Sequence, residues 1–550
     1  MKVAQLVSTV AALVSAVAAV PSFQELEARR AAALERHAAK RDARVYPKRQ
    51  VTTQPTISFS NPKAAEFFVD GCKDCIPEVH FDVGPSWSGL MPISSAPNPP
   101  ELFFWYWPAK HAENADDLVF WTNGGPGCSS LMGMLQENGP FTWPPGTGQP
   151  IENQWSWTNL SNVLWVEQPV GTGFSQGEVD IMDDDALAAQ ITGFLQQFLN
   201  VFSELKGKNL YLAGESYAGY YVPYLANYLY ENPHELALNM KGIWLADPTI
   251  SWDVVQQYIP AYAFVEKWKD VFAFSQEFML DLRNASEFCG YNDYMDQYLT
   301  YPPKGPLPLP EDAFYGLPGA LNISQPCATW DSIAAEAVNV NPNFNYFRIL
   351  DTWPVSWDVL GVPGSFLNKQ SPIYFNRTDV QDVIHAPRMS WQECSVPPVY
   401  VNRTDYSMPS SLTVLPSVIE KNVRTVIMHG LLDFILLSDG TRIAIQNMTW
   451  GGLQGFQTPI QPDTFKIDGF GTVGAMHEER KLTYIEVNLA GHMLPQYAPW
   501  AAYKSLAYLL GHQELNSTAL DALLYPNDQQ LYGRMGSMEA RRRLPHFSDL

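Results

Sequence analysis

The fold of this chain is decided by the stretch Leu210-Tyr211-Leu212-Ala213-Gly214-Glu215-Ser216-Tyr217-Ala218-Gly219-Tyr220-Tyr221. An apolar run ends there in small residues around Ser216, and an apolar, aromatic segment continues to Tyr230. This order predicts a strand, a sharp turn and a helix, with the serine hydroxyl held out at the apex of the turn. Ala218 stands where the strict Gly-x-Ser-x-Gly pattern has its second glycine, so an ordinary strand-to-helix turn is the alternative.

Other apolar runs repeat the pattern of this strand along the chain. Each is short and is followed by a turn; together with the first run they cover residues 118–121, 163–166, 210–213, 242–246, 423–428 and 484–487. A segment with apolar residues at helical spacing, 185–205, precedes the serine-bearing strand. Short buried runs separated by helices predict an α/β fold with a mostly parallel central sheet flanked by helices. In such sheets the working residues lie at the C-terminal ends of the strands.

This alternation of strands and helices stops between residues 251 and 371, which we interpret as an inserted cap or lid domain. The segment combines mixed helical patterns, a proline-rich piece and two cysteines, and a string of surface loops is the alternative. A long insertion of this kind is tolerated thermodynamically. The flanking segments 50–250 and 372–526 then form the two parts of the core, and residues 527–550 form an exposed tail.

The first fifty residues have the composition of targeting and processing segments. Lys2 precedes an alanine-rich apolar run that closes on small residues, which is typical of a signal peptide over residues 1–20. Residues 21–49 contain the dibasic pairs Lys40-Arg41 and Lys48-Arg49 and are interpreted as the pro-segment of a zymogen. A membrane anchor and a solvated helix are the respective alternatives. We therefore expect a secreted protein, or alternatively a vacuolar one, without membrane attachment once the signal is removed.

The composition describes an acidic protein with a large core. The 550 residues carry a formal net charge of -22, which argues against nucleic acid or anionic membranes as partners and suits work in acid. Six cysteines in an exported chain predict three disulfides, although metal binding stays open for Cys72-x-x-Cys75. Glycosylation sequons, typical of exported proteins, begin at Asn159, Asn284, Asn322, Asn376, Asn402, Asn447 and Asn516.

A serine hydroxyl is a poor nucleophile, so Ser216 needs a base and a carboxylate that orients the base. After such a turn the chain order is serine, acid, histidine. His492 alone among the later histidines follows a strand-like run, whereas His477 is expected in a charged loop. Asp433 likewise follows the run 423–428. A satisfied loop histidine and a turn-forming aspartate are the alternatives, but their joint placement favours the triad Ser216, Asp433 and His492.

Acyl chemistry also requires an oxyanion hole. One donor is the backbone N–H of the residue after the serine, Tyr217, and a second comes from an earlier glycine-rich loop. Gly124-Gly125 follows the run 118–121 and is well placed to supply that second donor, because glycine lets the backbone approach a substrate closely.

Five motifs stand in a characteristic order along the chain: Trp121-Thr-Asn-Gly-Gly-Pro-Gly-Cys-Ser-Ser130, Glu167-Gln-Pro-Val-Gly-Thr-Gly-Phe-Ser175, Gly214-Glu-Ser-Tyr-Ala-Gly219, Asp433 and Gly491-His-Met493. Together they resemble the serine carboxypeptidase family, above all its fungal secreted or vacuolar members, from about residue 55 to about residue 510. The resemblance implies an α/β-hydrolase fold with an inserted, helix-containing cap. It implies an enzyme that uses no cofactor or metal and releases single residues from the C-termini of peptides and proteins in acid, through an acyl-enzyme on Ser216.

The resemblance also assigns roles to individual residues. The N–H groups of Gly125 and Tyr217 would form the oxyanion hole, and Asn123, Glu137 and Glu215 would bind the terminal carboxylate of the substrate. Residues expected near the side-chain pockets are Met132, Gln136, Ile435, Leu436 and Met493. The implied disulfide is Cys128–Cys394, which leaves Cys289–Cys327 and Cys72–Cys75 as less secure pairs. The sequence departs from the family pattern at Glu167, where aspartate is commoner, at Gln136 and at Leu436, so the side-chain preference stays open.

Two carboxyl groups that share a site cannot both stay ionised cheaply, so the pKa of one rises. A protonated Glu137/Glu215 pair can donate a hydrogen bond to the carboxylate of a substrate, whereas an ionised pair repels it. We therefore expect KM to rise as the pair loses its proton. His492 must in turn be neutral to act as the base, which opposes activity in acid.

Two other classes of function compete with an exopeptidase. An esterase or acyltransferase would keep the fold and the triad, but the set Asn123, Glu137 and Glu215 serves no ester. A binding protein on the same fold predicts a broken triad, and all three triad residues are present. The expected partners are therefore peptide or protein C-termini, with the chain itself a monomer or a homodimer.

Overall fold

The computed structural model describes residues 59–310, 313–315, 321–352, 358–361, 373–396 and 398–515. The chain divides into two units, Met1–Gln50 and Val51–Leu550, and every described residue belongs to the second. The expected signal peptide 1–20, pro-segment 21–49 and tail 527–550 lie outside the described residues, so these three interpretations stay predictions.

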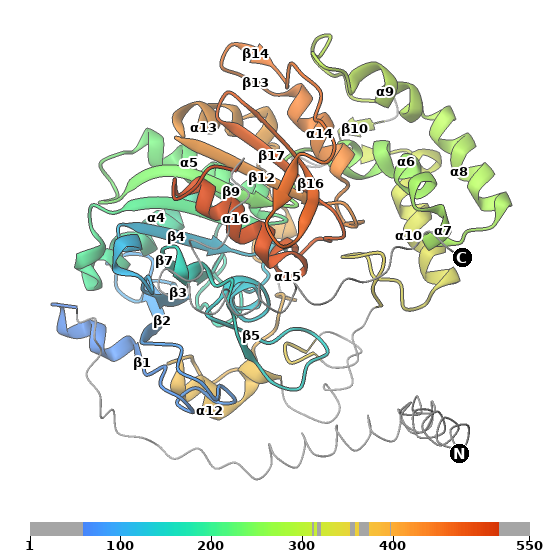
Figure 1. The fold of residues 1–550 in the computed structure, drawn as a ribbon. Coiled ribbons are helices and arrows are strands. Elements are labelled where there is room, and N and C mark those ends of the chain that lie inside the picture. Colours follow the sequence, from blue (N-terminus) through green and yellow to red (C-terminus); the bar gives the residue numbers. More distant parts are fainter. Residues whose placement is uncertain are drawn as a thin grey trace, which may run out of the picture. The chain divides into compact units, whose positions relative to one another are not determined.

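An eleven-stranded mixed sheet organises the second unit (Figure 1). In spatial order its strands are β1 (Phe68–Val69), β2 (Ser86–Pro92), β3 (Glu101–Trp107), β7 (Asn162–Glu167), β4 (Asp117–Thr122), β8 (Asn209–Glu215), β9 (Asn239–Ala246), β12 (Arg424–Gly430), β17 (Leu482–Val487), β16 (Gly471–Glu479) and β15 (Phe465–Ile467). The six strands from β7 to β17 are parallel, and they are the six apolar runs of the sequence. The parallel arrangement is confined to this centre, because both margins of the sheet are antiparallel.

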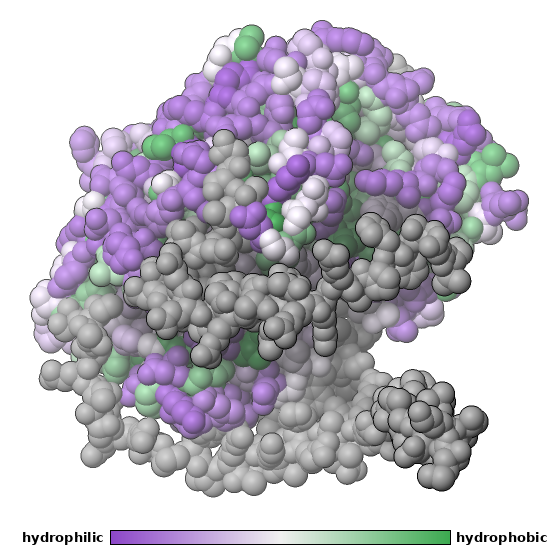
Figure 2. Space-filling view, viewed as in Figure 1, coloured by the Kyte–Doolittle hydropathy of each residue, from purple (hydrophilic) through white to green (hydrophobic). Residues whose placement is uncertain are grey.

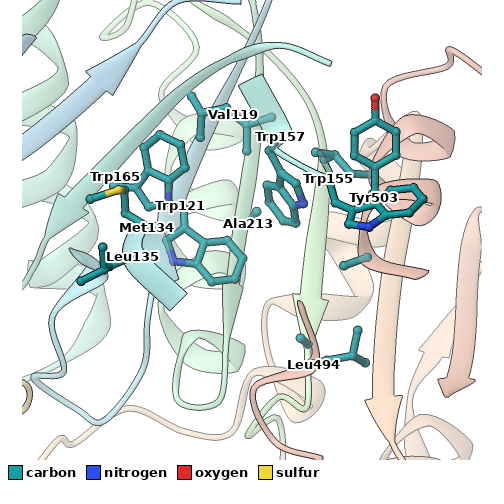
Figure 3. Close-up of a cluster of buried hydrophobic side chains, with 14 of the residues drawn as sticks. Val119, Trp121, Met134, Leu135, Trp155, Trp157, Trp165, Ala213, Leu494 and Tyr503 are labelled. Atoms are coloured by element: carbon teal, nitrogen blue, oxygen red, sulfur yellow. The ribbon is translucent and has the colours of Figure 1, made fainter. Parts of the chain in front are cut away.

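Both faces of the sheet are covered, which explains why the central strands are apolar without alternation. Leu118 and Phe120 of β4 point to one face, where they pack with side chains of α4 (Asp184–Val201), α5 (Ala218–Glu231), α13 (Leu415–Lys421) and α14 (Ser438–Asn447). Val119 and Trp121 point to the other face, among a second cluster that includes α15 (Leu494–Tyr497) and α16 (Pro499–Leu509). Figure 3 shows this second cluster, in which the rings of Trp121 and Trp157 meet edge to face at 5.1 Å.

The expectation of a charged loop around His477 is wrong, because this residue lies in β16. The strand pairs antiparallel with β17 on one side and β15 on the other. Strand β16 is only partly buried, and an antiparallel strand with one face near solvent can carry polar residues. Its sequence therefore lacks the apolar run that marks the central strands. The imidazole Nε2 of His477 lies 3.0 Å from Glu479 Oε1 in the same strand.

A group of helices lies between β9 and β12 in the chain and gathers apart from α4 and α5 (Figure 1). Its elements are α6 (Ile259–Lys267), α7 (Lys269–Phe272), α8 (Gln276–Phe288), α9 (Tyr291–Tyr298), β10 (Ala313–Tyr315), β11 (Leu321–Ile323) and α10 (Thr329–Val340). The later helix α12 (Thr378–Val383) lies apart from this group. Phe264, Phe272 and Ile333 from this group form a cluster with Leu432 and Phe434. The helices thus contact the loop of Asp433, while the limits of a cap at 251 and 371 stay a prediction.

Shorter elements include α3 (Ser130–Gly133), the π-helix Met134–Asn138 that follows it, the hairpin of β5 (Phe141–Thr142) and β6 (Ile151–Glu152), and the hairpin of β13 (Thr449–Trp450) and β14 (Leu453–Gln454). The face drawn in Figure 2 is mainly hydrophilic, with small hydrophobic areas. Within the described residues, no helix combines the length and the apolar character that crossing a membrane requires.

Three disulfides join the pairs expected from the sequence: Cys72–Cys75, Cys128–Cys394 and Cys289–Cys327. Cys72 and Cys75 are therefore bonded to each other, which answers the question of metal binding by free thiolates at that pair. Among the sequon asparagines, Asn284 and Asn402 are exposed, whereas Asn159, Asn376 and Asn447 are partly buried. The side chain of Asn322 and the whole of Asn516 lie outside the described residues. Occupancy of any sequon stays a prediction.

Candidate active site

Ser216 stands on the predicted turn between β8 and α5. Its φ is 60°, in the left-handed region that is rare for residues with a side chain and is typical of a strained functional turn. The turn is tight: a Cβ at Gly214 would lie 2.6 Å from the Cβ of Ala218, and one at Gly219 would lie 2.2 Å from the carbonyl oxygen of Thr249. Glycine at 214 thus makes room for Ala218, which explains the departure from the strict motif.

Asp433 and His492 are carried by two loops that touch each other. The backbone N–H of Leu432 donates to the carbonyl oxygen of Ala490 at 2.8 Å. A Cβ at Gly430 would lie 2.4 Å from the carbonyl oxygen of Gly491, so the first loop needs glycine where it meets the second. His492 Nδ1 then lies 2.7 Å from Asp433 Oδ2, and both side chains are buried.

Asp433 is held as a hydrogen-bond acceptor. Its Oδ1 accepts the backbone N–H groups of Ile435 at 2.7 Å and Leu436 at 3.2 Å, and its Oδ2 receives His492 Nδ1. Three donors on one carboxylate fix its orientation. The proton of His492 therefore resides on Nδ1, which leaves Nε2 able to accept a proton.

The glycine-rich loop after β4 lies directly against the turn that bears Ser216, between β8 and α5, which we call the elbow. A Cβ at Gly124 would lie 2.3 Å from the backbone nitrogen of Tyr217, so only glycine fits there. Gly125 has a φ of 114°, which also favours glycine. Gly124 and Gly125 line the same cavity as Ser216, an arrangement suited to an oxyanion hole made from the N–H groups of Gly125 and Tyr217.

Asn123 connects the hydrophobic core to two buried carboxyl groups. Its Oδ1 accepts from Trp121 Nε1 at 2.9 Å and from the backbone N–H of Gly133 at 3.1 Å, which fixes the orientation of the amide. Its Nδ2 must then face the carboxyl groups, and it donates to Glu215 Oε1 at 2.8 Å and to Glu137 Oε1 at 3.2 Å. The sequence-predicted set Asn123, Glu137 and Glu215 is thus brought together.

The two glutamates behave as one acid. Burial raises the pKa of Glu137 to about 7, and burial followed by the charge of Glu137 raises the pKa of Glu215 well above its ordinary value. Their remaining oxygens, Glu137 Oε2 and Glu215 Oε2, are buried without an ordinary donor among the described residues. A proton shared between the two carboxyl groups satisfies both oxygens, so the pair carries at least one proton in acid.

A cavity of about 920 Å³ opens at the elbow. Among its lining residues are the nucleophile and base candidates, the two loop glycines, Glu215 and four of the five expected pocket residues: Met132, Gln136, Ile435 and Met493. Leu436 is not among the lining residues; it is buried, and its backbone serves Asp433. Asn123 and Glu137 are also absent from the lining, so Glu215 presents the carboxyl pair to the cavity.

Three carboxyl groups near this cavity were not assigned roles from the sequence: Asp358 and Asp247, which are buried, and Glu393, which is partly buried. Asp358 accepts from Gln136 Nε2 at 3.0 Å, and burial followed by the charge of Asp358 raises the pKa of Glu393 to about 8. Both line the cavity. Asp247 lies behind the triad instead. Asp247 had a usable signal, because it directly follows the apolar run 242–246 and so stands at a strand end.

A mixed sheet covered by helices, with a serine on the turn after a central strand, defines the class of this protein as the α/β-hydrolase fold. The crystal structure of Kex1ΔP, a prohormone-processing carboxypeptidase from Saccharomyces cerevisiae, superposes with a TM-score of 0.65 over 83% of this chain and 99% of that chain, at 22% identity.

The family model of serine carboxypeptidases matches residues 77–512, and the chain belongs to that family, whose members release amino acids from the C-termini of peptides. A "Probable serine carboxypeptidase" of Arthroderma benhamiae is 46% identical over 84% of this chain and 89% of its own length. The "Serine-type carboxypeptidase F" of Aspergillus niger is 40% identical over 83% of this chain and 88% of its own length.

Proposed function

We propose that this chain is a carboxypeptidase that removes single residues from peptide or protein C-termini in acid, with Ser216, Asp433 and His492 as its triad. The observation that carries the proposal is the joint position of two features in one cavity. Ser216 and His492 line it, and so does Glu215, which belongs to a carboxyl pair held by Asn123. A site that holds a free carboxylate beside the nucleophile serves an exopeptidase.

In the first half of the reaction, Ser216 Oγ bonds to the carbonyl carbon of the last peptide bond while His492 Nε2 takes the hydroxyl proton. The developing oxyanion receives the N–H groups of Gly125 and Tyr217. His492 returns its proton to the leaving nitrogen, the C–N bond breaks, and the terminal amino acid departs. Water then attacks the acyl-enzyme, again through His492, and Ser216 is restored.

The carboxyl pair explains why a free C-terminus would be selected. With one proton, Glu137 and Glu215 can donate to the terminal carboxylate of the substrate; without it, they repel that carboxylate. Because the pKa of Glu137 is raised to about 7 by burial, the pair keeps its proton throughout the acid range. Binding is therefore expected to weaken, and KM to rise, as the pH passes neutrality.

Mass spectrometry on N-blocked peptides tests this function at about pH 4–5, where ordinary carboxyl groups titrate. Stepwise loss of single residues from a peptide with a free carboxylate, and much slower loss from its C-terminal amide, is expected. Ester cleavage with the peptides left intact would indicate an esterase instead. Ser216→Ala is the control, and activity that survives this substitution would remove the triad assignment.

We propose secretion, with the vacuole as the alternative, on the signal-like composition of residues 1–20 and the dibasic pairs within residues 21–49. N-terminal sequencing of protein from the medium and from a vacuolar fraction tests both segments. A mature N-terminus near residue 50 is expected in one fraction. Light scattering on the same material decides between a monomer and a homodimer.

A further inference from the structure

Asp247 lies at the end of β9, between the strand that carries Ser216 and the strand that leads to Asp433. Its backbone N–H donates to the carbonyl oxygen of Met428 at 2.8 Å, and its side chain is fully buried. Its φ is 43°, a left-handed conformation that favours Gly, Asn and Asp. The residue is thus held in a specific position directly behind the triad, where it does not line the cavity.

The two carboxyl groups of Asp247 and Asp433 are close neighbours. One oxygen from each lies, together with a ring nitrogen of His429, within 4.8 Å of one another. Asp247 Oδ1 accepts the backbone N–H of Gly430 at 2.7 Å, whereas Asp247 Oδ2 is buried and has no ordinary donor among the described residues. A buried oxygen of this kind needs a hydrogen-bond partner, and Asp433 is the neighbouring carboxyl group that interacts with the side chain of Asp247.

These three side chains do not fit a metal ion. The Nε2 of His429 lies 2.9 Å from the carbonyl oxygen of Leu436, which can only accept, so Nε2 carries the proton. Its Nδ1 lies 3.2 Å from Thr441 Oγ1 and accepts that hydroxyl. Both ring nitrogens are therefore used, and burial lowers the pKa of His429, so the ring is a neutral spacer.

The hydrogen bonds decide which carboxyl group holds a proton. Asp433 receives three N–H donors, whereas the carboxyl of Asp247 receives one. Burial and then the charge of Asp433 raise the pKa of Asp247 well above its ordinary value, and Glu137 adds to the effect. The titratable groups around Asp247 are thus Asp433 and His429, with the Glu137/Glu215 pair beyond them.

We propose that Asp247 is a positioning residue whose neutral carboxyl donates a hydrogen bond to Asp433 and thereby weakens the pull of Asp433 on a proton at His492. The proposal rests on the triad proposed above. Asp433 can then orient the imidazole without favouring the imidazolium strongly. This solves a problem that any serine hydrolase meets in acid, where the base must stay unprotonated.

The experiment compares Asp247→Asn with Asp247→Gly, because both residues accept the left-handed backbone. Asparagine accepts Gly430 N–H through its oxygen, so its amide nitrogen faces Asp433 as a permanent donor; glycine removes the donor. In Asp247→Gly, the acid limb of the kcat profile is expected about one pH unit higher, with KM little changed. Asp247→Asn is expected to restore the acid limb. Asp463→Gly, at an exposed residue with φ 59°, is the matched backbone control.

A small fluorophosphonate that reacts with the serine provides a second readout, because it has no carboxylate and is insensitive to the Glu137/Glu215 pair. Its rate of inactivation should show the same displaced acid limb. An acid limb in Asp247→Gly that coincides with wild type overturns the proposal. If that variant does not fold, Asp247→Asn still decides: an unmoved limb supports the proposal, and a limb displaced to lower pH means that Asp247 is charged and overturns it.

The failure of this proposal is distinguishable from failure of the proposed function. A wild-type protein that releases no C-terminal residue contradicts the function itself. A wild-type protein that releases residues, with pH profiles unaffected in both Asp247 variants, contradicts only the role of Asp247.

Discussion

Two pairs of buried carboxyl groups each have one member at the C-terminal end of a central strand, Glu215 in β8 and Asp247 directly after the neighbouring β9. The pairs differ in how the protein distributes N–H donors between their two members. Glu137 and Glu215 each receive one hydrogen bond from the amide of Asn123. Asp433 receives three donors and Asp247 one. A pair whose two carboxyl groups receive equal numbers of N–H donors, here called the even pair, can share its proton with a ligand. A pair whose donors are concentrated on one carboxyl group, here called the uneven pair, keeps the proton on the other. Only the even pair reaches the cavity, through Glu215.

The largest effect is expected at the uneven pair. Asp433→Asn replaces an acceptor of His492 Nδ1–H by a group that can stabilise the wrong tautomer, and kcat should fall by about 10⁴-fold, as in other triads. KM should change little, because the even pair is untouched. Steady-state kinetics on a peptide with a free carboxylate measure both constants, and Ser216→Ala gives the background rate. A kcat within about tenfold of wild type would separate Asp433 from the triad.

A smaller effect, on KM, is expected at the even pair. In the wild type, KM should rise as the pH passes about 7, where Glu137 titrates. Glu215→Gln supplies an amide donor that does not titrate and leaves only Glu137 to lose a proton, so its KM should rise less steeply than in wild type and lie up to about tenfold below wild type one pH unit above that point. The C-terminal amide of the same peptide is the control substrate. Parallel KM curves for the peptide and its amide would show that the pair does not sense the carboxylate.

Stability should depend on pH with a definite sign. Burial raises the pKa of Glu137 and of Glu167 to about 7, above the value near 4.3 of an exposed glutamate. The folded state therefore binds more protons than the unfolded state between about pH 4 and pH 7, so stability falls as the pH rises through that window and is greatest below it. Thermal unfolding should show a Tm several degrees lower at pH 8 than at pH 4.5.

Glu167→Gln isolates one contribution to this slope. Glu167 accepts the N–H of Phe174 at 2.6 Å and Trp391 Nε1 at 2.9 Å, and it also accepts the hydroxyl of Ser129. The amide cannot titrate, so the fall of Tm with pH should be shallower than in wild type. A Tm that increases steadily from pH 4.5 to 8 in the wild type would contradict the direction of these pKa shifts.

The smallest effect is expected at an exposed ion pair. Arg283 Nε lies 2.7 Å from Glu287 Oε1 on α8, but both side chains are exposed to solvent. Arg283→Ala should change Tm by no more than about 1 °C and leave kinetics and their pH dependence unchanged, because water screens such pairs. Differential scanning calorimetry compares it with the buried-pair variants. A loss of several degrees in Tm would mean that an exposed pair matters as much as a buried one, which would contradict the role assigned to burial in the two carboxyl pairs.

Much of the site was predictable because its residues follow apolar runs. Ser216, Asp433 and His492 each stand after a central strand, and the C-terminal ends of parallel strands meet at one edge. His477 was wrongly predicted to lie in a loop, because β16 is an antiparallel strand that is only partly buried, and such a strand needs no apolar run in its sequence. The pairing of Asp247 with Asp433 depends on β9 and β12 being neighbours, although about 180 residues separate them in the chain and sequence periodicity carries no strand order.

The contact between Gly430 and Gly491 has a consequence for redesign. The two loops are in backbone contact there and are joined by the hydrogen bond from Leu432 to Ala490, so we expect the spacing of Asp433 and His492 to change little when a peptide enters the cavity. Met132 and Gln136 line the cavity from a different part of the chain, between β4 and β5. Exchanges at these two positions can therefore alter which side chains are accepted while the proton-transfer machinery is inherited unchanged.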